Sequence, residues 1–102
     1  MKLVKEEFLP YLNTSFQAHT SIGIVELILR EVNPLPRGIR PEVLRDPLAI
    51  VFEGPNQQPL QQDNFELHHP QLGVNIWCLV PISGPIPGVN PQANYLYQAT
   101  FN

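Results

Sequence analysis

The feature that most constrains this chain is a series of short segments in which apolar and polar residues alternate with a period of two. Successive strand residues point to opposite faces of a sheet, so this alternation predicts β-strands that bury one face. No helical segment separates them. The predicted strands are residues 15–20, 22–32, 48–54, 64–69, 74–80 and 94–101.

Each predicted strand carries a row of apolar side chains that would face a common interior. The inward rows are Phe16 and Ala18; Val25, Leu27 and Leu29; Leu48, Ile50 and Phe52; Phe65 and Leu67; and Tyr95, Tyr97, Ala99 and Phe101.

The remaining segments predict one short helix and several loops. The first dozen residues have helical spacing, but Pro10 keeps that helix short. Residues 33–47 hold four of the twelve prolines, which predicts a long loop with room for a one-turn helix at 41–44. Residues 81–91 are rich in Pro and Gly and predict a second loop.

The sequence therefore predicts a mainly β fold with about six antiparallel strands and one short N-terminal helix. Because sequential strands are expected to pair, the candidate architectures are a meander, a small barrel or a two-layer roll. A length of 102 residues gives room for one hydrophobic core, so we expect a single β domain over residues 1–102.

Charge and cysteine content exclude several classes of protein. A net charge of -3 with six basic residues argues against a nucleic-acid-binding protein. A single cysteine, Cys78, argues against a disulfide framework or a multi-cysteine zinc site and favours a reduced compartment. We see no signal peptide and no membrane span, and expect a cytoplasmic protein or a component of an assembled particle.

The predicted strand at 74–80 is apolar on both faces, which a strand with one solvated face would not be. Val74, Ile76, Cys78 and Val80 form one row, and Trp77 and Leu79 lie on the other side. Two explanations stay open: the N-terminal helix and Pro-rich loops cover the outer face, or another chain does.

The histidines do not predict a metal site. Consecutive strand residues face opposite ways, so His68 and His69 cannot share one ion. Glu66 and His68 share an outward face and could pair, but this is typical of solvent-facing residues, and His19 stands alone. For His69 we expect a structural role, with its ring packed beside Pro70 and bonded to the turn that follows.

No catalytic or cofactor-binding group is predicted. A nucleophilic thiol needs a cationic neighbour and access, and Cys78 is predicted to be buried and inert between Trp77 and Leu79. The sequence has no nucleophile elbow and no phosphate-binding glycine loop.

Two loops are candidates for contact with a partner. Arg37, Arg40 and Arg45 lie in the Pro-rich segment, where arginines either bind a carboxylate or phosphate group or only keep the loop hydrated. Ile86 and Val89 lie in the second loop and have no obvious place in the core, which favours docking.

Several motifs together resemble a known family. They are Phe-x-Pro at 8–10, Leu-Asn-Thr-x-Phe at 12–16, Glu-Val at 31–32, Pro-Leu-x-x-Val-Phe-x-Gly-Pro at 47–55, Phe-x-Leu-x-His-Pro-x-Leu-Gly at 65–73, Leu-Val-Pro at 79–81 and Tyr-x-Ala-x-Phe-Asn at 97–102. The chain resembles a family of small bacterial proteins known as a domain of unknown function. Its arginine-rich loop is longer and more Pro-rich than the family pattern.

The resemblance implies no activity, cofactor or catalytic residue. It implies gene neighbours that resemble phage-tail collar or tail-fibre proteins, and thus an accessory role in a tail-like assembly. We therefore expect a non-catalytic protein-interaction or assembly module, either self-associating as a homo-oligomer or binding another protein. The alternative is a small-molecule-binding barrel or weak enzyme with an internal pocket near Trp77, Tyr95 and Tyr97, and His69 or Arg45 at its mouth.

Overall fold

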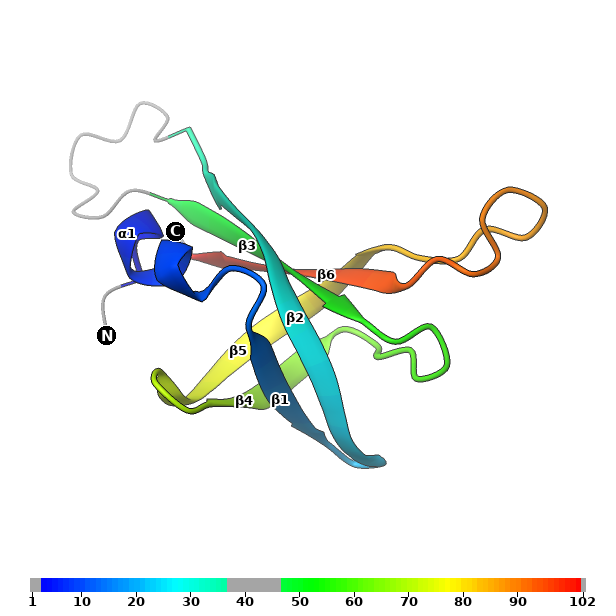
Figure 1. Cartoon of the computed structure of the whole chain (residues 1–102), viewed down its shortest axis with the longest axis horizontal. Coiled ribbons are helices and arrows are strands. Elements are labelled where there is room, and N and C mark those ends of the chain that lie inside the picture. The colour runs from blue at the N-terminus through cyan, green and yellow to red at the C-terminus, as the bar shows by residue number, and fades with distance from the viewer. Residues whose placement is uncertain (1–2, 37–46, 102) are drawn as a thin grey trace.

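The computed structural model describes residues 3–36 and 47–101, which form a closed six-stranded antiparallel barrel with one short helix (Figure 1). This confirms the predicted fold class and selects the barrel among the predicted architectures. The elements are α1 Lys5–Phe8, the 3-10 turn η1 Leu9–Tyr11, β1 Ser15–Thr20, β2 Gly23–Pro34, β3 Leu48–Gly54, β4 Asp63–His69, β5 Gly73–Ser83 and β6 Tyr95–Phe101.

The strand order around the barrel is β1-β2-β3-β6-β5-β4, and β4 pairs with β1 to close it. The expectation that all sequential strands pair is therefore wrong at β3 and β4. The connection between them crosses an end of the barrel, where Leu60 is buried and its N–H donates to the Tyr97 hydroxyl at 2.9 Å. The chain thus enters β4 beside β1, and the free edge of β3 pairs with β6.

The predicted inward rows form the core. All of their residues are buried except Tyr95, which is half-buried against that core. Leu60 fills one end of the barrel. At the other end, Phe8 of α1 packs against Trp77 and Phe101, with ring centroids 5.7 and 6.1 Å apart. The alternation thus predicted the interior, and aromatic and apolar side chains fill it.

The boundaries differ from prediction at two strands. β2 continues to Pro34, and β5 continues to Ser83, past the residues where a loop was expected. Proline is tolerated at these places because Pro34 is the last residue of β2 and Pro81 lies beside a register shift between β5 and β6. The helix is short, as expected, and Pro10 lies in the 3-10 turn that follows it.

Candidate functional site

The outer face of β5 is an exposed apolar surface, which we call the β5 row: Val74, Ile76, Cys78, Val80 and Ile82. Ile76 is 68% exposed and Val74 57%. The explanation that the helix and loops cover this face is therefore wrong for these side chains. The two-sided apolar pattern is real, but only Trp77 and Leu79 contribute to the interior.

Cys78 is exposed, and the prediction of a buried cysteine is wrong. Because residues alternate along a strand, placing Trp77 and Leu79 inside forces the thiol to the outer face. Its register partner across β4 is Asn64, which gives the sulfur no cationic neighbour there. Cys78 is thus an accessible side chain within an apolar row.

Next to this row, the register aligns polar and apolar residues across four strands. Ile24 of β2, His19 of β1, Glu66 of β4 and Ile76 of β5 lie in one line across the sheet. The line beside it contains Glu26, Gln17, His68 and Val74. Two histidines and a glutamate therefore sit between exposed aliphatic side chains on the barrel surface.

The three polar side chains form a compact group. His68 Nε2 and Glu66 Oε1 are 2.6 Å apart, so the predicted outward pair is confirmed. The His19 ring stacks on the His68 ring with centroids 3.8 Å apart, and the interpretation of His19 as isolated is wrong. Sequence reasoning missed this contact because pairing of β1 with β4 is not visible in the local pattern.

His69 lies on the opposite side of β4 and is buried. Its Nδ1 accepts hydrogen bonds from the backbone N–H groups of Gln71 and Leu72 at 3.1 and 3.3 Å, and its Nε2 lies 3.0 Å from Thr14 Oγ1. Burial of the ring lowers its pKa, because desolvation disfavours the charged form. The expected structural role of this histidine in the turn is confirmed.

A second cluster of polar side chains connects β2, β3 and Asn94, the residue before β6. Arg30 Nε donates to Glu53 Oε1 at 2.8 Å, and Asn94 Nδ2 donates to Glu53 Oε2 at 2.7 Å. The Asn94 hydrogen bond, followed by that from Arg30, lowers the pKa of the Glu53 carboxyl. The same arginine donates to Asn13 Oδ1 at 2.9 Å, so it ties the N-terminal segment to the barrel.

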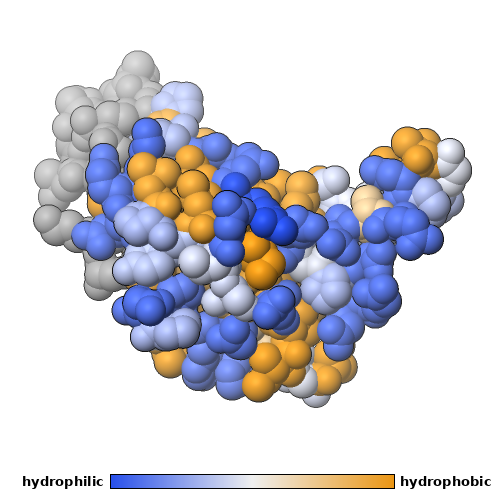
Figure 2. All heavy atoms as spheres, viewed as in Figure 1, coloured by the Kyte–Doolittle hydropathy of each residue, from blue (hydrophilic) through white to orange (hydrophobic). Residues whose placement is uncertain are grey.

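The structure separates the predicted partner contacts into two sets. Arg37, Arg40 and Arg45, like the one-turn helix expected at 41–44, lie outside the described residues. Ile86 and Val89 are 51% and 76% exposed at the tip of the connection from β5 to β6, which projects from the barrel (Figure 1). Figure 2 shows hydrophobic atoms gathered at this tip.

The tip is an ordered turn. The Asn90 and Val89 N–H groups donate to the Ile86 carbonyl oxygen at 2.9 and 3.0 Å, and Gly88 takes a positive φ of 80°. Asn90 Oδ1 accepts a further hydrogen bond from the Ile86 N–H. The two apolar side chains are therefore presented on a fixed backbone, although their contact with a partner stays a prediction.

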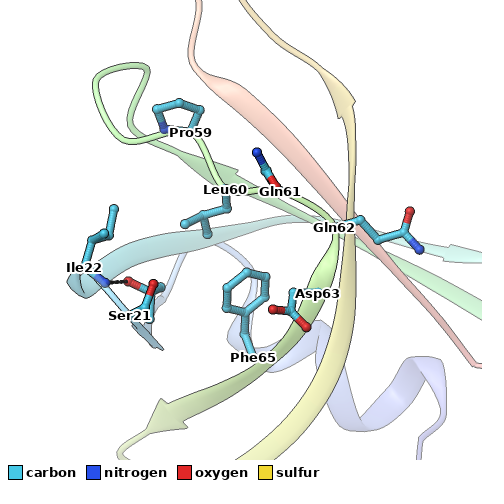
Figure 3. Close-up of a pocket in the computed structure, with 9 residues that line it drawn as sticks. Ser21, Ile22, Pro59, Leu60, Gln61, Gln62, Asp63 and Phe65 are labelled. Atoms are coloured by element: carbon cyan, nitrogen blue, oxygen red, sulfur yellow. Dashed lines mark hydrogen bonds between the residues drawn. The ribbon is translucent and has the colours of Figure 1, made fainter.

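A hollow of about 460 Å³ lies between the β1–β2 turn and the β3–β4 connection (Figure 3). Leu60 and Phe65 line its apolar part, and Thr20, Gln61 and Asp63 supply polar groups. Asp63 is its one carboxylate, and Asp63 Oδ1 accepts a hydrogen bond from the Asn64 N–H. This lining can hold a polar ligand by hydrogen bonds, but no histidine, cysteine or lysine accompanies Asp63 among its residues.

Comparison with known proteins places the fold in a family. The chain matches the family model for a domain of unknown function, DUF6916, over residues 3–101. The chain belongs to the DUF6916 family. No curated protein and no solved structure matches it. Membership of DUF6916 assigns neither an activity nor a ligand, so the function must be argued from the surfaces described above.

Within the described residues, no helix has the length and hydropathy needed to cross a bilayer.

Proposed function

We propose that this DUF6916 chain is a non-catalytic assembly module that self-associates through the β5 row. The supporting observation is the exposure of five consecutive outward residues of β5, all of them apolar or a cysteine. Contiguous exposed apolar side chains are typical of interaction surfaces. The exposed Ile86 and Val89 at the tip of the β5–β6 connection offer a further apolar surface.

A second copy of this chain is the partner that suits the row best. In a twofold dimer the same patch meets itself, so the patch must be complementary to its own copy. An uncharged aliphatic row satisfies this condition, whereas a row of one charge would repel itself. A charged content of only 15% for the whole chain agrees with part of the surface being covered in an assembly.

The alternative, a barrel with an internal ligand pocket, has less support. Tyr97 is fully buried and Trp77 nearly so, and the tyrosine hydroxyl already accepts the Leu60 N–H. Side chains therefore occupy the region where that pocket was expected. The hollow in Figure 3 lies at the surface and lacks a reactive pair.

The biological setting that we propose is an accessory subunit of a phage-tail-like or tail-fibre assembly in a bacterium, made in the cytoplasm. This setting rests on the family resemblance. The β5 row and the tip of the β5–β6 connection are compatible with it, because assembly subunits associate through preformed surfaces.

The test is the solution mass under reducing conditions, by sedimentation over a range of concentrations. We expect a wild-type dimer or larger oligomer and a monomer for Val80→Asp, because a buried unpaired carboxylate opposes association. Ile24→Asp is the matched control, since Ile24 is an exposed strand residue on β2, outside the β5 row. It should associate like the wild type.

The Cys78 thiol gives an independent footprint of the same surface. In the wild type its reaction with a thiol reagent should slow as protein concentration rises, while Val80→Asp should react at one rate throughout. A monomeric wild type with a thiol that reacts equally fast at all concentrations would exclude self-association through this row.

A further inference from the structure

We propose that His19, Glu66 and His68 bind one divalent transition-metal ion, of which Zn²⁺ is the probe, on the outer face of the barrel. The proposal does not rest on self-association, because all three ligands belong to β1 and β4, although Val74 and Ile76 of the β5 row flank them.

The first support is geometric. The three side chains each offer one ligand atom, and these atoms all lie within 4.8 Å of one another. Around a tetrahedral zinc ion with bonds of about 2.0–2.1 Å, ligand atoms are separated by about 3.4 Å. Rotations about side-chain bonds can bring the three ligand atoms to this separation, since His19 and Glu66 are exposed and His68 is half-buried.

The hydrogen bond within the group shows that its ligand atoms already converge. His68 Nε2 and Glu66 Oε1 are 2.6 Å apart, so both atoms point to the position of the shared proton. A metal ion would take that position, the two atoms would move apart, and the His68 ring would carry its proton on Nδ1. The stacked His19 ring must then turn until a ring nitrogen, rather than the ring face, points to the ion.

The donor set indicates the class of ion. Two imidazole nitrogens and one carboxylate oxygen suit Zn²⁺, Co²⁺, Ni²⁺ and Cu²⁺, whereas Mg²⁺ and Ca²⁺ prefer oxygen ligands. Three protein ligands leave a fourth position of a tetrahedral ion for water.

The surroundings favour a cation. The residues that the register places beside the group are uncharged or acidic: Gln17, Ile24, Glu26, Val74 and Ile76. Exposed aliphatic side chains on both sides reduce water around the bound ion, which strengthens its attraction to the carboxylate.

The position of the group gives the site a structural consequence. His19 belongs to β1 and Glu66 and His68 to β4, the pair of strands that closes the barrel (Figure 1). A bound ion would link His19 of β1 to both Glu66 and His68 of β4. It should therefore raise the melting temperature of the protein, because the ion binds the folded state in preference to the unfolded chain.

The test is a Zn²⁺ titration of protein without a histidine tag, followed by calorimetry or equilibrium dialysis. We expect one ion per chain, with affinity reduced about tenfold or more in His19→Ala, His68→Ala and Glu66→Gln. Glu26→Gln is the matched control, because it removes a carboxylate from the same face outside the group. It should lose much less Zn²⁺ affinity than the three ligand variants.

Co²⁺ supplies a second readout through its visible absorption. The wild type should give the strong bands of a tetrahedral site, and the His19→Ala/His68→Ala double variant should not. Circular dichroism of each variant establishes that it is folded, as expected for changes at surface positions. Equal Zn²⁺ affinity of the wild type and the double variant would overturn the proposal. A loss of Zn²⁺ affinity in Glu26→Gln as large as that in the ligand variants would overturn it as well.

Discussion

At the scale of single residues, His69 illustrates how one side chain can fix a turn. Its Nδ1 accepts hydrogen bonds from two backbone N–H groups, so the ring proton is on Nε2. The Nε2–H group therefore donates a hydrogen bond to Thr14 Oγ1. The Thr14 hydroxyl in turn donates to the Tyr11 carbonyl oxygen at 2.6 Å. One buried ring therefore connects the β4–β5 turn to the segment that leads from the helix into β1.

Replacing His69 with leucine should destabilise the fold by about 2–3 kcal/mol, because the ring's polar partners would lose a buried acceptor or donor. His69→Gln should cost less, since its side-chain oxygen can still accept from the turn. Urea unfolding at neutral pH measures the difference. His68→Leu is the neighbouring control and should stay within about 0.5 kcal/mol of the wild type, as a surface change does. A similar loss in both leucine variants would contradict the structural role of His69.

The residues also show where sequence reasoning reaches its limit. The Glu66–His68 pair and the buried His69 could be predicted, because alternation along one strand decides which way each side chain points. The contact of His19 with His68 could not, since it depends on which strand lies beside β1. Cys78 was misplaced because both rows of its strand are apolar, and only the packing of Trp77 shows which row is inside.

At the scale of elements, the end of β3 depends on the absence of a side chain at Gly54. A Cβ atom there would lie 2.7 Å from Leu27 Cδ2 and 3.1 Å from Tyr97 Cε2. Both are core side chains that are fully buried. With a larger residue at position 54, the Leu27 side chain would therefore have to shift within the packed core.

Gly54→Ala should lower the free energy of unfolding by about 1–3 kcal/mol, as overpacking of a core does. The same substitution should cost less in a Leu27→Ala background, where the closest atom is gone, although Leu27→Ala itself is destabilising. A double-mutant cycle by urea denaturation measures this coupling. Additive effects of the two substitutions would show that the contact with Leu27 is not the cause of the destabilisation by Gly54→Ala.

The elements themselves were largely predictable, whereas their order was not. Periodicity located all six strands, with errors of a few residues where β2 and β5 continue into proline-containing segments. The pairing of β3 with β6 and the hydrogen bond from the Leu60 N–H to the Tyr97 hydroxyl each join residues far apart in the chain. Local pattern carries no signal for such a contact.

At the scale of the whole molecule, the barrel is not equally paired around its circumference. β3 and β6 pair at seven positions, from Leu48 with Phe101 to Gly54 with Tyr95. β1 and β4 pair at three, from Gln17 with His68 to His19 with Glu66, and β5 and β6 also pair at three, with a register shift between Pro81 and Ser83. Because a short ladder has few hydrogen bonds to break, the β1–β4 and β5–β6 seams are the parts of the barrel expected to open at the lowest free energy.

Hydrogen exchange should therefore be faster for the amides that bond across the β1–β4 seam, within residues 17–19 and 66–68, than for those between β3 and β6. Exchange followed by NMR at neutral pH resolves the two sets. Zn²⁺ should slow exchange at the seam in the wild type, because an ion held by His19, Glu66 and His68 ties β1 to β4. The His19→Ala/His68→Ala variant is the control, and its seam should exchange at the same rate with and without Zn²⁺. Uniform protection around the metal-free barrel would show instead that it opens only by global unfolding, with the seam as stable as the long ladder.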